Sequence, residues 1–111
     1  MKRYLYKVKK IAENLDWNVD IDDKDVTFQR YSGAGQDFFF SIKIEDDMAD
    51  FCDEVYNYYE GFDVSYEAYL WLDDTGHGSN GAPYEMIDVY NDMKECEEEI
   101  EKLWQALREE T

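Results

Sequence analysis

Between Lys43 and Lys94 the chain contains no lysine and no arginine. These fifty residues hold fourteen carboxylates and the only histidine, His77. A soluble domain normally intersperses charges of both signs, because unbalanced charge destabilises the compact state by self-repulsion. A chain that keeps this repulsion over nearly half its length is expected to bind a strongly cationic partner. Nucleic acid, anionic membranes and acidic substrates are disfavoured as direct partners, because they would repel a net charge of -17.

Cysteine and long apolar runs are also scarce. Two cysteines, Cys52 and Cys96, do not make a disulfide framework, so we expect buried free thiols, with a bridge between them as the alternative. No apolar run approaches the length that spans a bilayer, and the lysine-rich start lacks the hydrophobic stretch of a signal peptide. These absences favour a cytoplasmic protein with no membrane partner.

What is present indicates a folded domain. The chain is 111 residues long and 17% aromatic, which is too aromatic for a disordered acidic tail and long enough for one modest core. We therefore predict a single domain over residues 1–111. Its charge is uneven, because residues 1–15 carry a net charge of +4 and the remainder a net charge of -21.

The first part of the chain changes from helical to alternating periodicity. Tyr4, Val8, Ile11 and Leu15 recur at helical spacing and predict a helix over residues 2–16. Apolar and polar residues then alternate in three segments joined by polar or glycine-containing turns, which predicts an antiparallel three-stranded meander. The segments are residues 17–22, 26–31 and 38–44. Such a sheet needs helices on one face to be stable.

The second part of the chain is predicted to supply these helices. Asp46 or Asp47 caps an amphipathic helix that ends at Gly61. Residues 65–72 fit a strand by alternation or a short helix by capping, and we predict the helix. Pro83 is placed as the first residue of a last helix about 40 Å long at ~1.5 Å per residue. The predicted fold is α+β, in the order αβββααα, with a long carboxy-terminal helix.

An apolar stripe runs along this last helix at near-heptad spacing. Its members are Met86, Val89, Tyr90, Met93, Cys96, Ile100, Leu103, Trp104 and Leu107. The helix is longer than the sheet it would cover. Two alternatives follow: part of the stripe pairs with a second copy to form a homodimer, or all of it packs within the chain.

The glycine-rich loop 73–82 matches three short catalytic or nucleotide-binding patterns. Gly76, Gly78 and Gly81 form G-x-G-x-x-G, Asp74-Thr75-Gly76 resembles an aspartic-protease triplet, and Asp74-x-Gly76-x-Gly78 resembles a box of histidine-kinase-type ATPases. Each lacks the strands or helices that its family places around it. We interpret the loop as a turn with glycines at positive φ. His77, expected to be exposed, has no nucleophile or orienting partner.

No metal or cofactor site is predicted either. Asp20-x-Asp22 begins like a calcium loop, but Lys24 replaces the third ligand and the later glycine and glutamate are missing. With no catalytic constellation and no cofactor motif, we expect a protein that is not an enzyme.

Acidic and aromatic side chains are the predicted partner-binding residues. On a helix, residues three or four apart share a face and lie about 5–6 Å apart, so carboxylates at this spacing form rows. Tyrosines near them supply contact area at low entropic cost. The acidic residues are Asp46, Asp47, Asp50, Asp53, Glu54, Glu60, Asp73, Asp74, Glu85, Asp88, Asp92 and Glu95, and the aromatic residues are Tyr56, Tyr69 and Tyr84.

In length, charge and order of elements, the chain resembles small acidic inhibitors of phages and mobile elements that mimic DNA, namely anti-restriction proteins and Cas9-directed anti-CRISPRs. The resemblance implies a bacterial host cytoplasm and a basic partner, a nucleic-acid-binding enzyme. It also implies a mechanism in which carboxylates fill a groove built for phosphates. The alternatives are an acidic protein-interaction module and an antitoxin or immunity-type protein that neutralises a basic toxin.

Overall fold

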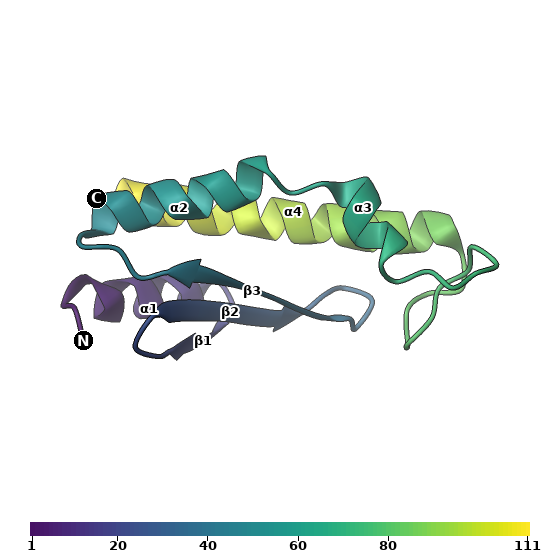
Figure 1. Ribbon diagram of the computed structural model, residues 1–111, viewed down its shortest axis with the longest axis horizontal. Helices are drawn as coiled ribbons and strands as arrows, with labels where there is room; N and C mark the ends of the chain where they lie inside the picture. The colour runs from purple at the N-terminus through teal and green to yellow at the C-terminus, as the bar shows by residue number, and fades with distance from the viewer.

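Helices and strands follow one another in the predicted order αβββααα in the computed structural model of residues 1–111, which confirms the α+β fold class (Figure 1). The amino-terminal helix and the meander lie close to their predicted bounds. The elements are α1 (Tyr4–Asn14), β1 (Asn18–Ile21), β2 (Asp25–Tyr31), β3 (Asp37–Lys43), α2 (Met48–Glu60), α3 (Val64–Tyr69) and α4 (Met86–Glu109).

The sheet has the order β1-β2-β3, with antiparallel neighbours in which Phe28 lies opposite both Val19 and Phe40. Side chains along β3 alternate between buried and exposed, because successive residues of a strand point to opposite faces. The outer face is mostly polar, with Phe39 as an exposed apolar exception. It is linked across strands by hydrogen bonds of 2.7 Å, such as that between Thr27 and Ser41. Only the inner face therefore needs cover.

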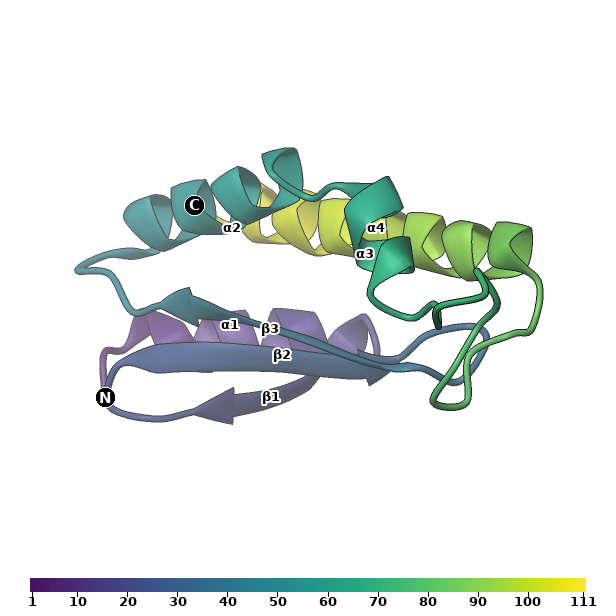
Figure 2. The same ribbon diagram turned by 45° about the vertical axis from the view of Figure 1, so that its right-hand side comes forward.

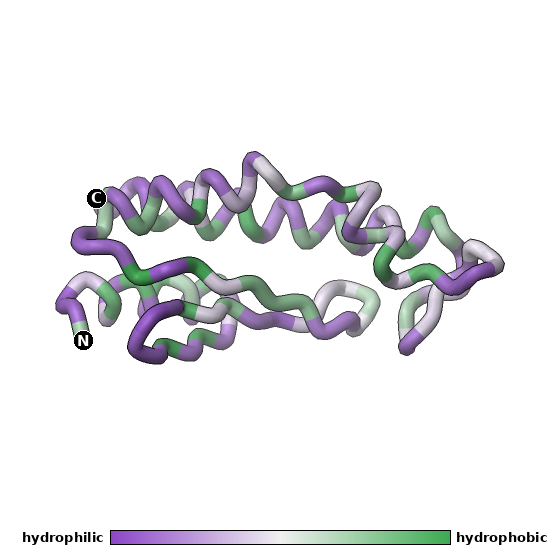
Figure 3. The backbone as a smooth tube through the Cα atoms, viewed as in Figure 1, coloured by the Kyte–Doolittle hydropathy of each residue, from purple (hydrophilic) through white to green (hydrophobic).

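The helices supply this cover. Figures 1 and 2 show α1 behind the sheet and α2 and α4 running side by side in opposite directions. Tyr58 of α2 stacks on Phe40 of β3, with ring centroids 4.3 Å apart. In Figure 3 the apolar positions of α4 alternate with hydrophilic ones along its length. The buried side chains form one core cluster that includes Trp17, Phe28 and Phe51.

The apolar stripe of α4 packs within the chain, which was one of the two alternatives. Val89, Met93, Cys96, Ile100, Leu103 and Leu107 are all buried. Tyr90 and Trp104 are half-buried against the core, and Met86 is the exposed member. Cys52 and Cys96 are buried free thiols, as predicted, and burial raises the pKa of Cys96 to about 12.

Aspartates cap the two shorter helices of the second half. The carboxylate of Asp47 accepts a hydrogen bond of 2.9 Å from the backbone N–H of Asp50, and Asp63 accepts one from Tyr66. Such caps satisfy backbone donors that the first helical turn leaves free. The helix predicted for residues 65–72 is therefore correct in type, but it spans 64–69, because Leu72 forms a β-bridge with Gly78.

The predicted start of the last helix is wrong. Pro83 is not its first residue, because α4 begins at Met86 after an extended Glu85. The carbonyl of Tyr84 accepts a hydrogen bond of 3.0 Å from the N–H of Gly78, which holds the preceding segment against the loop. A helix could form only beyond this contact. With 24 residues, α4 is about 36 Å long rather than 40 Å.

The molecule is elongated, with extents of 47 × 22 × 21 Å. Both termini lie at one end, where Lys7 contacts Glu110 (Figure 1). We call the opposite end, formed by α3, the loop 70–85 and the first turns of α4, the distal end. None of the helices combines the length and the apolar composition that crossing a bilayer requires.

Replacing Gly78 by alanine should destabilise the protein, because the added Cβ would lie 1.8 Å from the carbonyl oxygen of Pro83. Overpacking of this kind costs about 1–3 kcal/mol. The matched control is Gly61→Ala, whose Cβ would meet its nearest atom at an ordinary 3.4 Å. Urea unfolding of both variants measures the difference, and equal stabilities would contradict the close approach.

Candidate binding surface: carboxylate rows and an apolar groove

Carboxylates line the outward face of α2. All six predicted acidic residues from Asp46 to Glu60 are exposed. Asp53 and Glu54 lie three and four residues after Asp50, so each is a neighbour of Asp50 on the helix surface at a spacing of about 5–6 Å. The opposite face buries Phe51, Cys52 and Val55 in the core. The row is therefore presented by a helix whose orientation is fixed by packing.

The distal end continues this acidic surface. Asp73 and Asp74 in the loop, Glu85 before α4 and Asp88 in its first turn are all exposed. Asp63, the N-cap of α3, is also exposed, whereas Glu67 of α3 is half-buried. No lysine or arginine occurs between Lys43 and Lys94, so no cation of α2, α3 or the loop neutralises them.

Few of these carboxylates are engaged by cations elsewhere in the chain. The salt bridges are Lys2–Asp46, Lys7–Glu110 and two pairs made by Glu99, with Arg30 and with Lys102. Among the predicted partner-binding acids, only Asp46 is paired, at 3.7 Å. Apart from Asp46, no carboxylate of the α2 face or the distal end forms a salt bridge. Arg108 of α4 lies beside α2, over the ring of Trp104.

Asp92 does not belong to this surface, which corrects its assignment to the partner-binding face. It is 5% exposed, and its carboxylate accepts hydrogen bonds of 2.5 Å from the Ser32 hydroxyl and 2.9 Å from the Ala34 N–H. The spacing explains the burial, because Asp92 follows Val89 by three residues and precedes Cys96 by four. Its role is to tie the β2–β3 hairpin to α4.

Glu95 is exposed, but it also faces this hairpin. A Cβ added at Gly33 would lie 2.7 Å from a carboxylate oxygen of Glu95. Arg30, Glu95 and Glu99 border the same hollow between the hairpin and α4. Glu95 therefore lies beside the residues that join sheet and helix.

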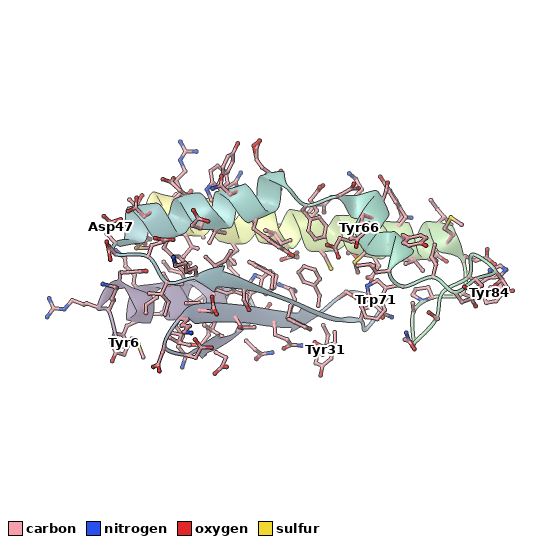
Figure 4. All side chains as sticks on the ribbon, viewed as in Figure 1. Tyr6, Tyr31, Asp47, Tyr66, Trp71 and Tyr84 are labelled. Atoms are coloured by element: carbon pink, nitrogen blue, oxygen red, sulfur yellow. The ribbon has the colours of Figure 1, made fainter.

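The three predicted tyrosines have different surroundings. Tyr56 belongs to the seam between α2 and α4, where its ring centroid lies 4.7 Å from that of Trp104. In the same seam the hydroxyl of Tyr59 donates to Glu101, a bond that raises the pKa of Tyr59 to about 12. Tyr69 and Tyr84 are exposed at the distal end, where Figure 4 labels Tyr84 at the tip of the molecule.

The loop 73–82 is a tightly hydrogen-bonded turn. The carboxylate of Asp73 accepts from the Thr75 N–H, the Thr75 hydroxyl and the His77 N–H. These bonds lower the pKa of Asp73, with the Thr75 hydroxyl as the largest cause. Gly76 and Gly81 adopt positive φ, as predicted, whereas Gly78 is required for its close approach to Pro83.

His77 is half-buried rather than exposed, which corrects the prediction. Its ring stacks on Tyr84 with centroids 3.9 Å apart and planes 12° from parallel. Its Nδ1 atom is buried without a hydrogen-bond partner. His77 therefore helps to fix the ring of Tyr84 at the tip of the distal end.

An apolar groove between α3 and the start of α4 was not predicted. Tyr69, Leu72, Met86, Ile87 and Tyr90 line it, above the buried Ala68. One signal in the sequence could have indicated it. Ile87 follows Met86 directly and lies outside the buried i, i+3, i+4 stripe, so an apolar side chain there has no place in the core.

Comparisons with known proteins give no match: no protein family, curated protein or solved structure shows significant similarity to the chain. No group of three or more His, Cys, Asp and Glu side chains is placed to hold a metal ion. The two features that stand out are the uncompensated carboxylates and the apolar groove beside them.

Replacing Asp92 by alanine should destabilise the protein, because it leaves the Ser32 hydroxyl and the Ala34 N–H without their charged acceptor. Hydrogen bonds to charged groups contribute about 1.5–3 kcal/mol each. Asp88→Ala, one turn earlier and exposed, is the matched control and should change stability by no more than about 0.5 kcal/mol. Urea unfolding that ranks the two variants equally would contradict the buried role.

Replacing Glu67 by glutamine should stabilise the protein near neutral pH. Burial, aided by the neighbouring Asp63, raises the pKa of Glu67 above its ordinary 4.5. The folded state therefore binds this proton more tightly than the unfolded state, and stability falls as pH rises through the folded pKa. The advantage of Glu67→Gln should shrink below that pKa. Thermal unfolding of both proteins from pH 4 to pH 7 checks this, and a constant difference would exclude the titration.

Proposed function

We propose that this protein is a non-enzymatic mimic of nucleic acid that occludes the cationic nucleic-acid groove of a bacterial defence nuclease, in the manner of an anti-CRISPR or anti-restriction inhibitor. One observation carries the proposal: a rigid surface, from Asp47 on α2 to Asp88 on α4, presents carboxylates with no basic residue among them. Its natural complement is a surface that evolved to hold phosphates.

The charge density supports this complementarity. The molecule is 47 Å long and carries a net charge of -17, which corresponds to one net negative charge per about 2.8 Å of its length. B-DNA carries one negative charge per ~1.7 Å of helix axis. The protein thus offers more than half the linear charge density of the duplex, and the basic residues counted in this average lie mostly outside the acidic surface.

The expected mechanism is occlusion. Lysine and arginine side chains of the nuclease pair with the carboxylates, and the counterions of both surfaces are released. The logarithm of the binding constant should then fall linearly with the logarithm of the salt concentration. The folded scaffold holds the carboxylates in place before binding, so little ordering entropy opposes the complex.

The apolar groove favours a second candidate, an acidic protein-interaction module such as an antitoxin or immunity-type protein. In that case apolar contacts dominate affinity, and binding depends little on salt. Salt titration of the complex separates the two candidates, because screening weakens charge pairs between exposed groups and leaves apolar burial almost unchanged.

The test uses the protein immobilised as bait in a bacterial lysate cleared of nucleic acid, with elution by stepped sodium chloride. The proposal predicts that a nuclease elutes with salt. Added protein should displace labelled duplex DNA from that purified nuclease. The triple variant Asp50→Lys, Asp53→Lys, Glu54→Lys should lose this displacement, because three pairing partners become repulsive.

A matched triple variant controls for net charge. Glu13→Lys, Asp20→Lys and Asp23→Lys change the charge by the same amount at exposed residues of α1, β1 and the first turn. This variant should still displace the DNA. Displacement that survives in both variants, or a complex indifferent to salt, would contradict mimicry through the α2 face.

A further inference from the structure

The groove at the distal end is lined by several exposed apolar side chains that lie outside the core. Tyr69 is 68% exposed, Ile87 62% and Met86 53%, and all three border the same hollow of about 740 Å³. Scattered exposed apolar residues are ordinary, but several that converge on one hollow mark an interaction site. Nothing in the chain covers them.

The charge at the rim of the groove restricts the charge of the occupant. Glu85 borders the hollow directly and is the only charged residue that lines it. The nearest basic residue in the sequence, Lys94, lies one helical turn beyond Tyr90 and does not line the hollow. With Glu85 as its only charged lining residue, the groove favours an occupant that carries positive charge beside its apolar side chains. The distal end of a second copy is repelled, because it presents the same carboxylates.

The walls of the groove restrict the shape of the occupant. They are formed by α3 and the start of α4, whose backbone amides beyond the first turn are bonded within the helices. No free strand edge lines the hollow, so an extended segment would find no backbone partners. A helix needs none, because its own backbone bonds are internal, and its apolar side chains at i, i+3 and i+4 can enter a groove between two helices.

We propose that this groove docks a basic amphipathic helix of the partner, with apolar side chains between Tyr69 and Ile87 and with a lysine or arginine side chain paired to Glu85. The inference rests on the proposed function and adds to it the chemistry of the partner at the distal end. Carboxylate rows alone would fit many phosphate-binding clefts, whereas an apolar anchor requires a specific element beside the cleft.

The probe is a synthetic peptide of about 18 residues, five turns at ~3.6 residues per turn, made of leucine and lysine with the leucines on one face. Titration into isotopically labelled protein should shift the backbone resonances of Tyr69, Met86 and Ile87. A peptide of the same composition with scrambled order has the same charge but no apolar face. It should bind at least tenfold more weakly in moderate salt. Equal binding of the two peptides would overturn the inference.

Matched tyrosine variants locate the contact. Tyr69→Ser should weaken peptide binding about tenfold, which is the effect of exposing one large apolar side chain. Tyr31→Ser removes a tyrosine of equal exposure, 67%, from the end of β2, and Figure 4 shows this residue on the side of the sheet away from the helical layer. It should leave the affinity unchanged. Equal losses in both variants would overturn the inference.

Two further measurements distinguish this inference from self-association at the groove and from the mimicry proposal. Sedimentation measures self-association, and a dimer that Ile87→Ser abolishes would make a second copy the occupant and refute a partner helix. The nuclease complex distinguishes the two proposals. If Ile87→Ser displaces DNA as strongly as the unchanged protein, the groove fails while mimicry stands. If the peptide docks at the groove but no DNA is displaced, mimicry fails while the groove stands.

Discussion

Burial of the α4 stripe against the sheet is the interaction on which the structure depends. A net charge of -17 on 111 residues opposes any compact state by self-repulsion, and there is no disulfide to offset it. The opposing force comes from one core in which Val89 to Leu107 of α4 meet the aromatic side chains of the sheet and Phe51 of α2. Apolar burial does not depend on the sign of surface charge, so the surface is free to be acidic.

The charge is distributed unevenly over the surface. Eight of the eleven lysines and arginines precede α2 in the sequence. All four salt bridges join a cation to a carboxylate at the termini end or to Glu99 near the hairpin. The distal end has no cation, and it is fixed by other means: Asp73 organises its loop through three hydrogen bonds, and His77 stacks on Tyr84. Local polar bonds there hold like charges in place.

The sequence predicted the fold through periodicity, because strand alternation and helical spacing are set by backbone geometry that every residue shares. It failed where one tertiary contact overrides the local pattern. Pro83 had the right chemistry for a helix start, but the contact between Gly78 and Tyr84 delays the helix to Met86. Asp92 was assigned to the surface by its charge, although its spacing placed it in the buried stripe. The groove required knowing that α3 ends beside Ile87, which is a long-range contact that no local pattern contains.

Exposed carboxylates and the apolar groove contribute to binding in different ways. Charge complementarity acts at long range and raises the association rate, but every phosphate-binding protein offers a similar field, so charge alone selects a class of partner rather than one partner. An apolar anchor acts only at contact and slows dissociation. A mimic that competes with DNA must distinguish one nuclease from the many basic proteins of a cell. The placement of Tyr69 and Ile87 beside Glu85 joins the two effects within a single contact area, so a partner gains full affinity only when it carries both positive charge and an apolar helix face.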